Sequence, residues 1–123
     1  MRFTLNYGGP LKANRGPKEK QKLRRHFHCQ LKRLWEQPPL ADFTVWLKPE
    51  VGAREISLVE AVGSFQFVPL VSKRIHMLAE LGLTILRPGP PGDLVNHGGD
   101  IDNRVKTLLD ALRVPRAPQD IVR

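Results

Sequence analysis

Two aspartates and a lysine late in the sequence have the types and the spacing that metal-dependent phosphodiester chemistry needs. Asp100 and Asp102 stand two residues apart after a pair of glycines, and Lys106 follows four residues later. In an extended segment, residues i and i+2 project to the same side, so the two carboxylates could converge on one cation. Mg²⁺ takes oxygen ligands, and one or two carboxylates with a substrate phosphate can hold it. The lysine could then bind the phosphate or stabilise the charge that develops as the P–O bond breaks.

The same spacing also occurs in helices that have no catalytic role. An aspartate at a helix start is a common N-cap, and Asp102, Lys106 and Asp110 form a ladder of i, i+4 positions whose charges alternate. Such a ladder can stabilise a helix by ion pairing alone. Spacing therefore leaves a catalytic and a structural interpretation open.

The excess positive charge lies in the first quarter of the chain. The net charge is +8, and residues 1–33 contain ten Lys and Arg residues but one acidic residue, Glu19. A basic block of this kind releases counterions when it meets a polyanion, so nucleic acid is the first partner to consider. The alternative is a solvated face that only keeps the protein soluble. The expected nucleic-acid contacts are Lys12, Asn14, Arg15, Lys18, Lys22, Arg24, Arg25, Lys32 and Arg33, with Asn103 and Arg104 beside the aspartates.

The apolar periodicity predicts three helices that would carry these residues. The first, over residues 18–36, ends before Pro38 and Pro39. A short helix is expected over 72–80, with Gly82 after it as a C-cap signal, and the last over 102–112. The apolar stripe of the first helix consists of Leu23, Phe27, Leu31, Leu34 and Trp35, and that of the last consists of Val105, Leu108, Leu109 and Leu112.

Alternating or β-branched segments predict strands over residues 3–7, 43–47, 55–59, 64–68 and 83–86, with Gly63 near the turn between two of them. Strands and helices are interspersed along the chain. The pattern therefore predicts an α/β fold of mixed α+β character, in which helices flank a mixed β-sheet. With 123 residues, we expect a single compact domain spanning 1–123.

Composition excludes several classes of protein. No apolar run approaches the ~18 residues of a membrane span, and the first residues lack the apolar core of a signal peptide. The single cysteine, Cys29, cannot form an internal disulfide, which fits a reducing cytoplasm. Walker-type loops, CxxC pairs and serine–histidine motifs are absent from the sequence, so we expect no small-molecule cofactor.

Residues 99–112, Gly-Asp-Ile-Asp-Asn-Arg-Val-Lys-Thr-Leu-Leu-Asp-Ala-Leu, resemble the signature D-x-D-N-x-x-K-x-x-x-D-A-L of RusA-type Holliday-junction resolvases. All its fixed positions match without a gap. The resemblance implies that Asp100 and Asp102 bind Mg²⁺, for which Mn²⁺ can substitute, and that Lys106 assists catalysis. It also implies a homodimeric endodeoxyribonuclease, encoded by a bacterium or phage and acting in the cytoplasm. Such enzymes cleave four-way junctions in branched double-stranded DNA during recombination and repair.

The end of the chain departs from the family pattern. That pattern has a further acidic residue, usually within an Asp-Asp pair, shortly after the D-A-L turn, whereas Asp120 is the only acidic residue after Asp110 here. Either Asp120 is the third metal ligand, or that ligand lies beyond an end truncated at Arg123, or the site is incomplete. In the last case, we expect a non-catalytic, basic nucleic-acid-binding protein.

Overall fold

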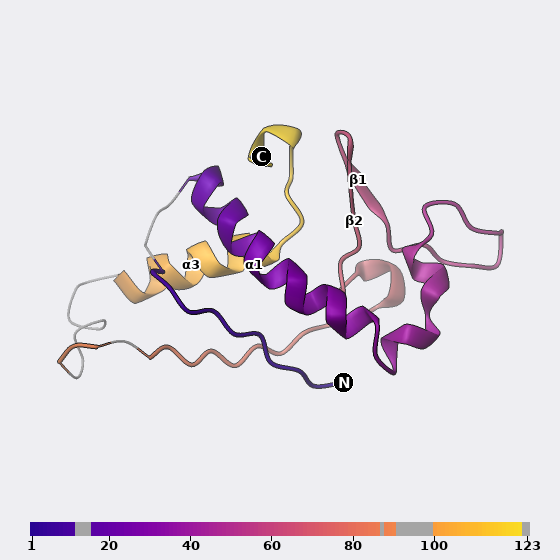
Figure 1. Ribbon diagram of the computed structural model, residues 1–123. Coiled ribbons are helices and arrows are strands. Elements are labelled where there is room, and N and C mark those ends of the chain that lie inside the picture. The colour runs from indigo at the N-terminus through magenta and orange to yellow at the C-terminus, as the bar shows by residue number, and fades with distance from the viewer. Residues whose placement is uncertain (12–15, 87, 91–99, 122–123) are drawn as a thin grey trace.

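Two crossing α-helices form the centre of the computed structural model, which describes residues 1–11, 16–86, 88–90 and 100–121. Helix α1 spans Pro17–Trp35, and helix α3 spans Asp100–Leu112 (Figure 1). A two-stranded antiparallel sheet, β1 (Glu60–Val62) with β2 (Phe65–Phe67), lies to one side of the helix pair. The described fold is therefore of mixed α+β type. Short 3-10 helices complete it: η1 (Leu40–Asp42), η2 (Thr44–Leu47), η3 (Lys73–Ile75) and η4 (Pro118–Asp120).

Helix α1 confirms the helix predicted over residues 18–36. The signals at both of its ends and its buried apolar side indicate the same element. Pro17 stands in its first turn, where a missing N–H costs no hydrogen bond. Glu19 lies in the first turn, while Lys32 and Arg33 lie in the last, so these charges complement the helix dipole. The helix ends before the Pro38-Pro39 pair, as expected.

The cluster of buried hydrophobic residues that joins the two helices lies where α1 and α3 cross. Leu23 and Phe27 of α1 are 5% exposed, and Ala111 of α3, at 1%, allows the two backbones to approach closely. Burying one Leu or Phe side chain stabilises a fold by about 1.5–3 kcal/mol, so this contact positions α3 on α1. Partly buried side chains surround the three, namely Leu5, Tyr7, Leu11, Leu108 and Leu112.

The opening segment is extended but does not form the expected strand over 3–7. The backbone polar groups of Asn6 bond to side chains of α1 instead of a neighbouring strand. The amide of Asn6 donates to Gln30 Oε1 at 2.8 Å, and Gln30 Nε2 donates to the Asn6 carbonyl at 2.6 Å. The segment therefore runs along α1, where side chains of that helix satisfy the backbone groups of Asn6.

Residues 43–47 were expected as a strand, and that prediction is wrong. Thr44–Leu47 forms the 3-10 helix η2, in which residues three apart lie on the same side. Phe43 consequently stacks on Trp46, with ring centroids 4.3 Å apart and planes 13° apart. A strand would place these two rings on opposite faces of a sheet.

The hairpin confirms the turn at Gly63 and the strand expected over 64–68. Gly63 has a φ of 62°, and Val62 pairs with Phe65 across the turn. The partner strand, expected over 55–59, instead begins at Glu60. The hairpin register decides this, because Glu60 must lie opposite Phe67.

The helix expected over 72–80 is reduced to the single turn η3. The Ser72 hydroxyl caps it by accepting from the amide of Arg74 at 3.2 Å, but His76 then adopts a left-handed φ of 52° and ends it. The strand expected over 83–86 does not form either, since the described residues place no strand beside it to share backbone hydrogen bonds. The described sheet is consequently antiparallel, not mixed. Across the described ranges, no helix combines the length and apolar character that crossing a bilayer requires.

Candidate functional site

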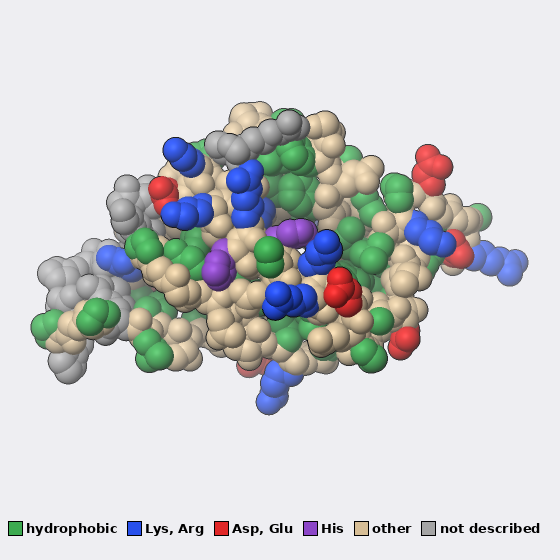
Figure 2. Space-filling model, viewed as in Figure 1, with side chains coloured by type: hydrophobic (Ala, Val, Ile, Leu, Met, Phe, Trp, Pro, Cys, Tyr) green, Lys and Arg blue, Asp and Glu red, His purple; other side chains and the backbone are tan. Residues whose placement is uncertain are grey.

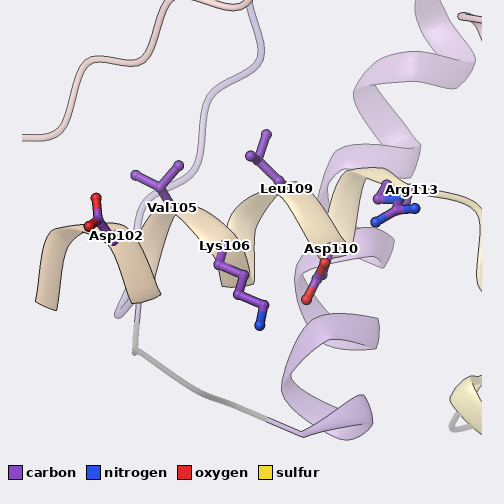
Figure 3. A pocket seen from close by; sticks show the side chains of 6 residues that line it. All are labelled: Asp102, Val105, Lys106, Leu109, Asp110 and Arg113. Carbon is purple, nitrogen blue, oxygen red and sulfur yellow. The ribbon is translucent and has the colours of Figure 1, made fainter. Parts of the chain in front are cut away.

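One face of α3 carries most of the candidate chemistry. Asp102 and Lys106 are both exposed and line a shallow hollow of about 390 Å³ (Figure 3). The remaining lining comes from Val105, Leu109, Asp110 and Arg113. At 3.6 residues per turn, Asp102, Lys106, Asp110 and Arg113 fall within about 80° around the helix axis, so they form one polar stripe.

Asp100 is the first residue of α3, and its side chain lies outside what the structure describes. We expected the two aspartates in an extended segment before the helix, where their side chains would share a side. Inside a helix, positions two apart are instead separated by about 200° around the axis. Because α3 already includes both aspartates, their spacing no longer predicts that the two carboxylates converge on one cation. Asp102 is the aspartate that lines the hollow.

Asp102 has an exposed carboxylate, which is the kind of oxygen ligand that Mg²⁺ binds. Within the described ranges, its carboxylate takes part in no hydrogen bond or ion pair, so no described group occupies its oxygens. In Figure 3 it points away from Lys106, and the Asp102–Lys106 ion pair of the structural interpretation does not form. Mg²⁺ can be held by one carboxylate with phosphate oxygens and waters, which this arrangement allows. The described part of the chain contains no cluster of three acidic, His or Cys side chains arranged to bind a metal ion.

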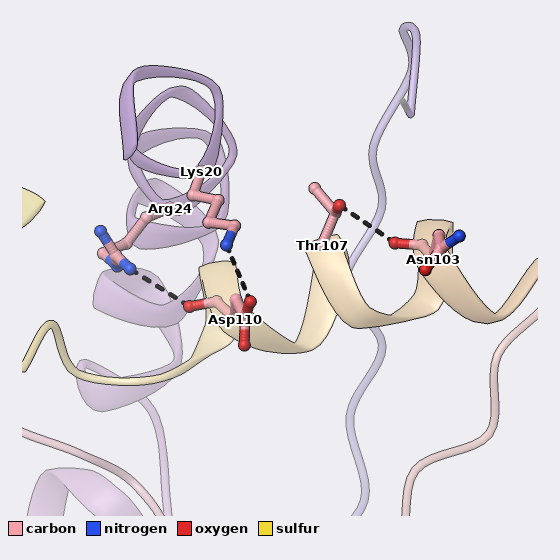
Figure 4. Close-up of polar contacts among 5 residues, drawn as sticks. All are labelled: Lys20, Arg24, Asn103, Thr107 and Asp110. Carbon is pink, nitrogen blue, oxygen red and sulfur yellow. Dashed lines mark hydrogen bonds and ion pairs between the residues drawn. The ribbon is translucent and has the colours of Figure 1, made fainter. Parts of the chain in front are cut away.

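Asp110 is tied to α1 rather than to Lys106. Its Oδ2 accepts from Lys20 Nζ at 2.8 Å, and the two side chains are 27% and 28% exposed (Figure 4). This hydrogen bond lowers the pKa of Asp110 below 3.8; partial burial opposes the shift, and the charges of Lys20, Lys106 and Arg113 add to it. The carboxyl group is therefore ionised and largely neutralised by its partner.

Arg24 fastens the C-terminal end of α3. Its Nε donates to the Arg113 carbonyl at 3.2 Å, and one terminal nitrogen donates to the Asp110 carbonyl at 3.2 Å. The other donates to Gln21 Oε1 at 2.5 Å. A guanidinium group suits the unpaired carbonyls at a helix end. Burial lowers the pKa of Arg24, while the charges of Asp120 and Asp110 raise it.

Asn103 and Arg104 also have structural partners in α3 and before α1. The Asn103 carbonyl accepts from the Thr107 hydroxyl at 3.1 Å, and one terminal nitrogen of Arg104 donates to the Leu11 carbonyl. Both residues are half-buried. The contact of Arg104 joins the start of α3 to the segment that leads into α1, so this arginine has a positioning role in the fold.

Asp120 lies toward the opposite end of α3 from Asp102. Its carboxylate accepts from the Ala117 amide at 3.2 Å within η4, and its charge acts on Arg24. Arg24 binds the Asp110 carbonyl, which lies about 12 Å along the axis from Asp102 at 1.5 Å per residue. Two ligands of one Mg²⁺ each lie about 2 Å from the ion. The structure therefore does not bring Asp120 to Asp102.

Five of the basic residues predicted to contact nucleic acid form an exposed stripe on α1. They occupy positions within about 100° around the axis, opposite the buried Phe27. Figure 2 shows Lys and Arg side chains gathered over this helix. The five, named here the basic stripe, are Lys18, Lys22, Arg25, Lys32 and Arg33. Lys12, Asn14 and Arg15 lie outside the described residues.

Comparisons with models of protein families, with curated proteins and with solved structures found no match to this chain. The site is therefore described only from the geometry and chemistry of this chain's own residues.

The sequence analysis missed two residues of the site, Lys20 and Arg113. Arg113 had a visible signal, since it follows Lys106 by two helical turns, whereas Lys20 and Asp110 are 90 residues apart and no local pattern connects them.

Proposed function

We propose that this protein is a Mg²⁺-dependent endonuclease of branched DNA, with residues 1–123 forming one nuclease domain that acts as a homodimer on four-way junctions. The observation that carries the proposal is that Asp102 and Lys106 line one exposed hollow on the helix that Asp100 begins. The match of residues 99–112 to the resolvase signature supports the same chemistry. We place its action in the cytoplasm of a bacterium or of a phage-infected cell.

Asp102 would hold the cation, for which Mn²⁺ could replace Mg²⁺, and Asp100, which the resolvase signature assigns to the same ion, would join it only from a first turn of α3 that is not helical. Such an ion polarises a phosphate oxygen and lowers the pKa of an attacking water. Lys106 would place its ammonium group against the phosphate and stabilise the added negative charge. The N-terminal end of α3 favours an anion in the same position. The basic stripe on α1 would hold DNA backbones by charge, with little reading of base sequence.

Cleavage of a labelled synthetic four-way junction tests this proposal. We expect nicking that requires Mg²⁺ or Mn²⁺, that disappears in Asp102→Asn and that is strongly reduced in Lys106→Gln. Asp42→Asn is the matched control, because Asp42 is also exposed but lies in η1, outside α3. Junction binding should survive in all three variants. A wild-type protein that binds junctions but never nicks them at any Mg²⁺ or Mn²⁺ concentration would refute the nuclease proposal.

The basic stripe favours a second candidate, a nucleic-acid-binding protein without turnover. Its five exposed cations lie on α1, so binding through them does not require the acidic residues of α3. The same experiment separates the two functions. Binding without metal-dependent nicking would support this candidate, and nicking that Asp102→Asn abolishes would exclude it.

A further inference from the structure

We propose that Arg113 binds a backbone phosphate of the DNA strand that is cut, several nucleotides away from the cleaved bond. This inference rests on the proposed function, because it takes the Asp102 end of the hollow as the place of cleavage. It adds a second phosphate contact to the same face of α3. The observation behind it is that Arg113 lines the hollow with Asp102 and Lys106 although it lies at the far end of the helix.

Arg113 directly follows Leu112, the last residue of α3, and its amide bonds to the Asp110 carbonyl, so helix geometry approximates its position. It comes seven residues after Lys106, close to two complete turns, so the two cations lie on one line along α3 about 10 Å apart. Asp102 lies about 16 Å from Arg113 along the same axis. Phosphates of one strand follow the backbone contour, which is about twice as long as the axial rise of about 3.4 Å per nucleotide, so this spacing spans about two or three nucleotides if the strand follows the helix.

The side chain of Arg113 is available for a ligand. It is exposed, and the contacts that fix this residue use its backbone: its carbonyl accepts from Arg24 Nε, and its amide donates to the Asp110 carbonyl at 3.4 Å. Removing the guanidinium group therefore leaves the anchoring of α3 in place. A planar guanidinium group also binds phosphate oxygens in pairs, which a lysine cannot do.

The Asp110 carboxylate lies between Lys106 and Arg113, and it does not repel a phosphate because Lys20 neutralises it. Lys20 Nζ lies 2.8 Å from Asp110 Oδ2. The polar face of α3 therefore presents Lys106 and Arg113 on either side of this ion pair. The hollow is also shallow and open along α3, which suits an extended strand better than a small enclosed ligand. A DNA strand is thus the polyanion that fits the spacing, the charge and the shape.

Binding of a four-way junction in EDTA, measured over a range of salt concentrations, tests the inference without any cleavage. We expect Arg113→Gln to weaken binding by about three- to tenfold and to make the slope of log K against log salt smaller by about 0.9. Arg113→Lys should keep the slope. Arg54→Gln, with the same loss of charge in an exposed loop outside α3, is the matched control and should change neither quantity.

Single uncharged methylphosphonate linkages then locate the contact. Neutralising one phosphate about two or three nucleotides from the cleaved bond should weaken wild-type binding, but it should not weaken binding of Arg113→Gln further. The inference is wrong if Arg113→Gln and Arg54→Gln have the same junction affinity and the same salt slope. It is also wrong if no single linkage abolishes the difference in affinity between the wild type and Arg113→Gln. If the wild type does not nick, the cleaved bond is unknown. Placing the linkage at each phosphate in turn, in EDTA, then identifies the phosphate that Arg113 contacts. Failure of the nuclease proposal is therefore distinguishable from failure of this one.

Discussion

The Lys20–Asp110 ion pair gives the sharpest test of how α3 is held on α1. We predict a coupling energy of about 1 kcal/mol from a double-mutant cycle of Lys20→Gln and Asp110→Asn, measured by urea unfolding at pH 7. Exposed pairs contribute about 0.2–1 kcal/mol, and the upper end applies because the 2.8 Å hydrogen bond is short and each side chain is only about a quarter exposed. For a domain of this size, such a loss should lower Tm by about 3–5 °C.

The sign of the pH dependence follows from the lowered pKa of Asp110. A carboxyl group whose pKa is lower in the folded state stabilises the protein fully above its ordinary value of 3.8. That contribution is lost as the pH falls through the lowered value, so the coupling should vanish in strong acid. Lys20→Gln with Asp102→Asn is the control cycle, because Asp102 lies about 12 Å from Asp110 and the two changes should be additive. A coupling below about 0.3 kcal/mol at pH 7, or one that persists unchanged in strong acid, would contradict the role we assign to this pair.

Two further predictions concern positions that the fold constrains. Arg24→Met removes three hydrogen bonds and should lower the free energy of unfolding by about 2 kcal/mol, whereas Lys22→Met, on the exposed stripe, should change it by less than about 0.5 kcal/mol. Equal unfolding midpoints for these two variants would show that Arg24 does not anchor α3. Gly63→Ala should destabilise the protein by about 1–2 kcal/mol, because φ is 62° and an added Cβ would lie 3.0 Å from Cγ of Pro118. Gly82→Ala, where an added Cβ meets no atom within 4 Å, should be close to neutral in the same thermal unfolding assay.

The elements that the sequence predicted correctly are those with strong local signals. Helix α1 has a proline at its start, complementary charges at both ends and an apolar stripe, and the signals agree with one another. Helix α3 has the same kind of stripe, and Gly63 marks the hairpin turn. The predicted strands over 3–7 and 43–47 failed because alternation and β-propensity do not identify a partner. Asn6 bonded to Gln30, and Phe43 stacked on Trp46.

By itself, the sequence determined the chemical inventory: where the acidic and basic residues stand, which helices carry them, and that α1 has a basic side opposite an apolar one. Only the tertiary structure decided how those residues are distributed among roles. It separated Arg24, which fastens α3, from the exposed stripe, and it paired Asp110 with Lys20 rather than with Lys106. It also placed Arg113 in the same hollow as Asp102 and kept Asp120 away from it. The physical reason is that helix periodicity fixes which residues of one helix share a face, whereas contacts between residues 90 apart depend on how Leu23, Phe27 and Ala111 pack the two helices together.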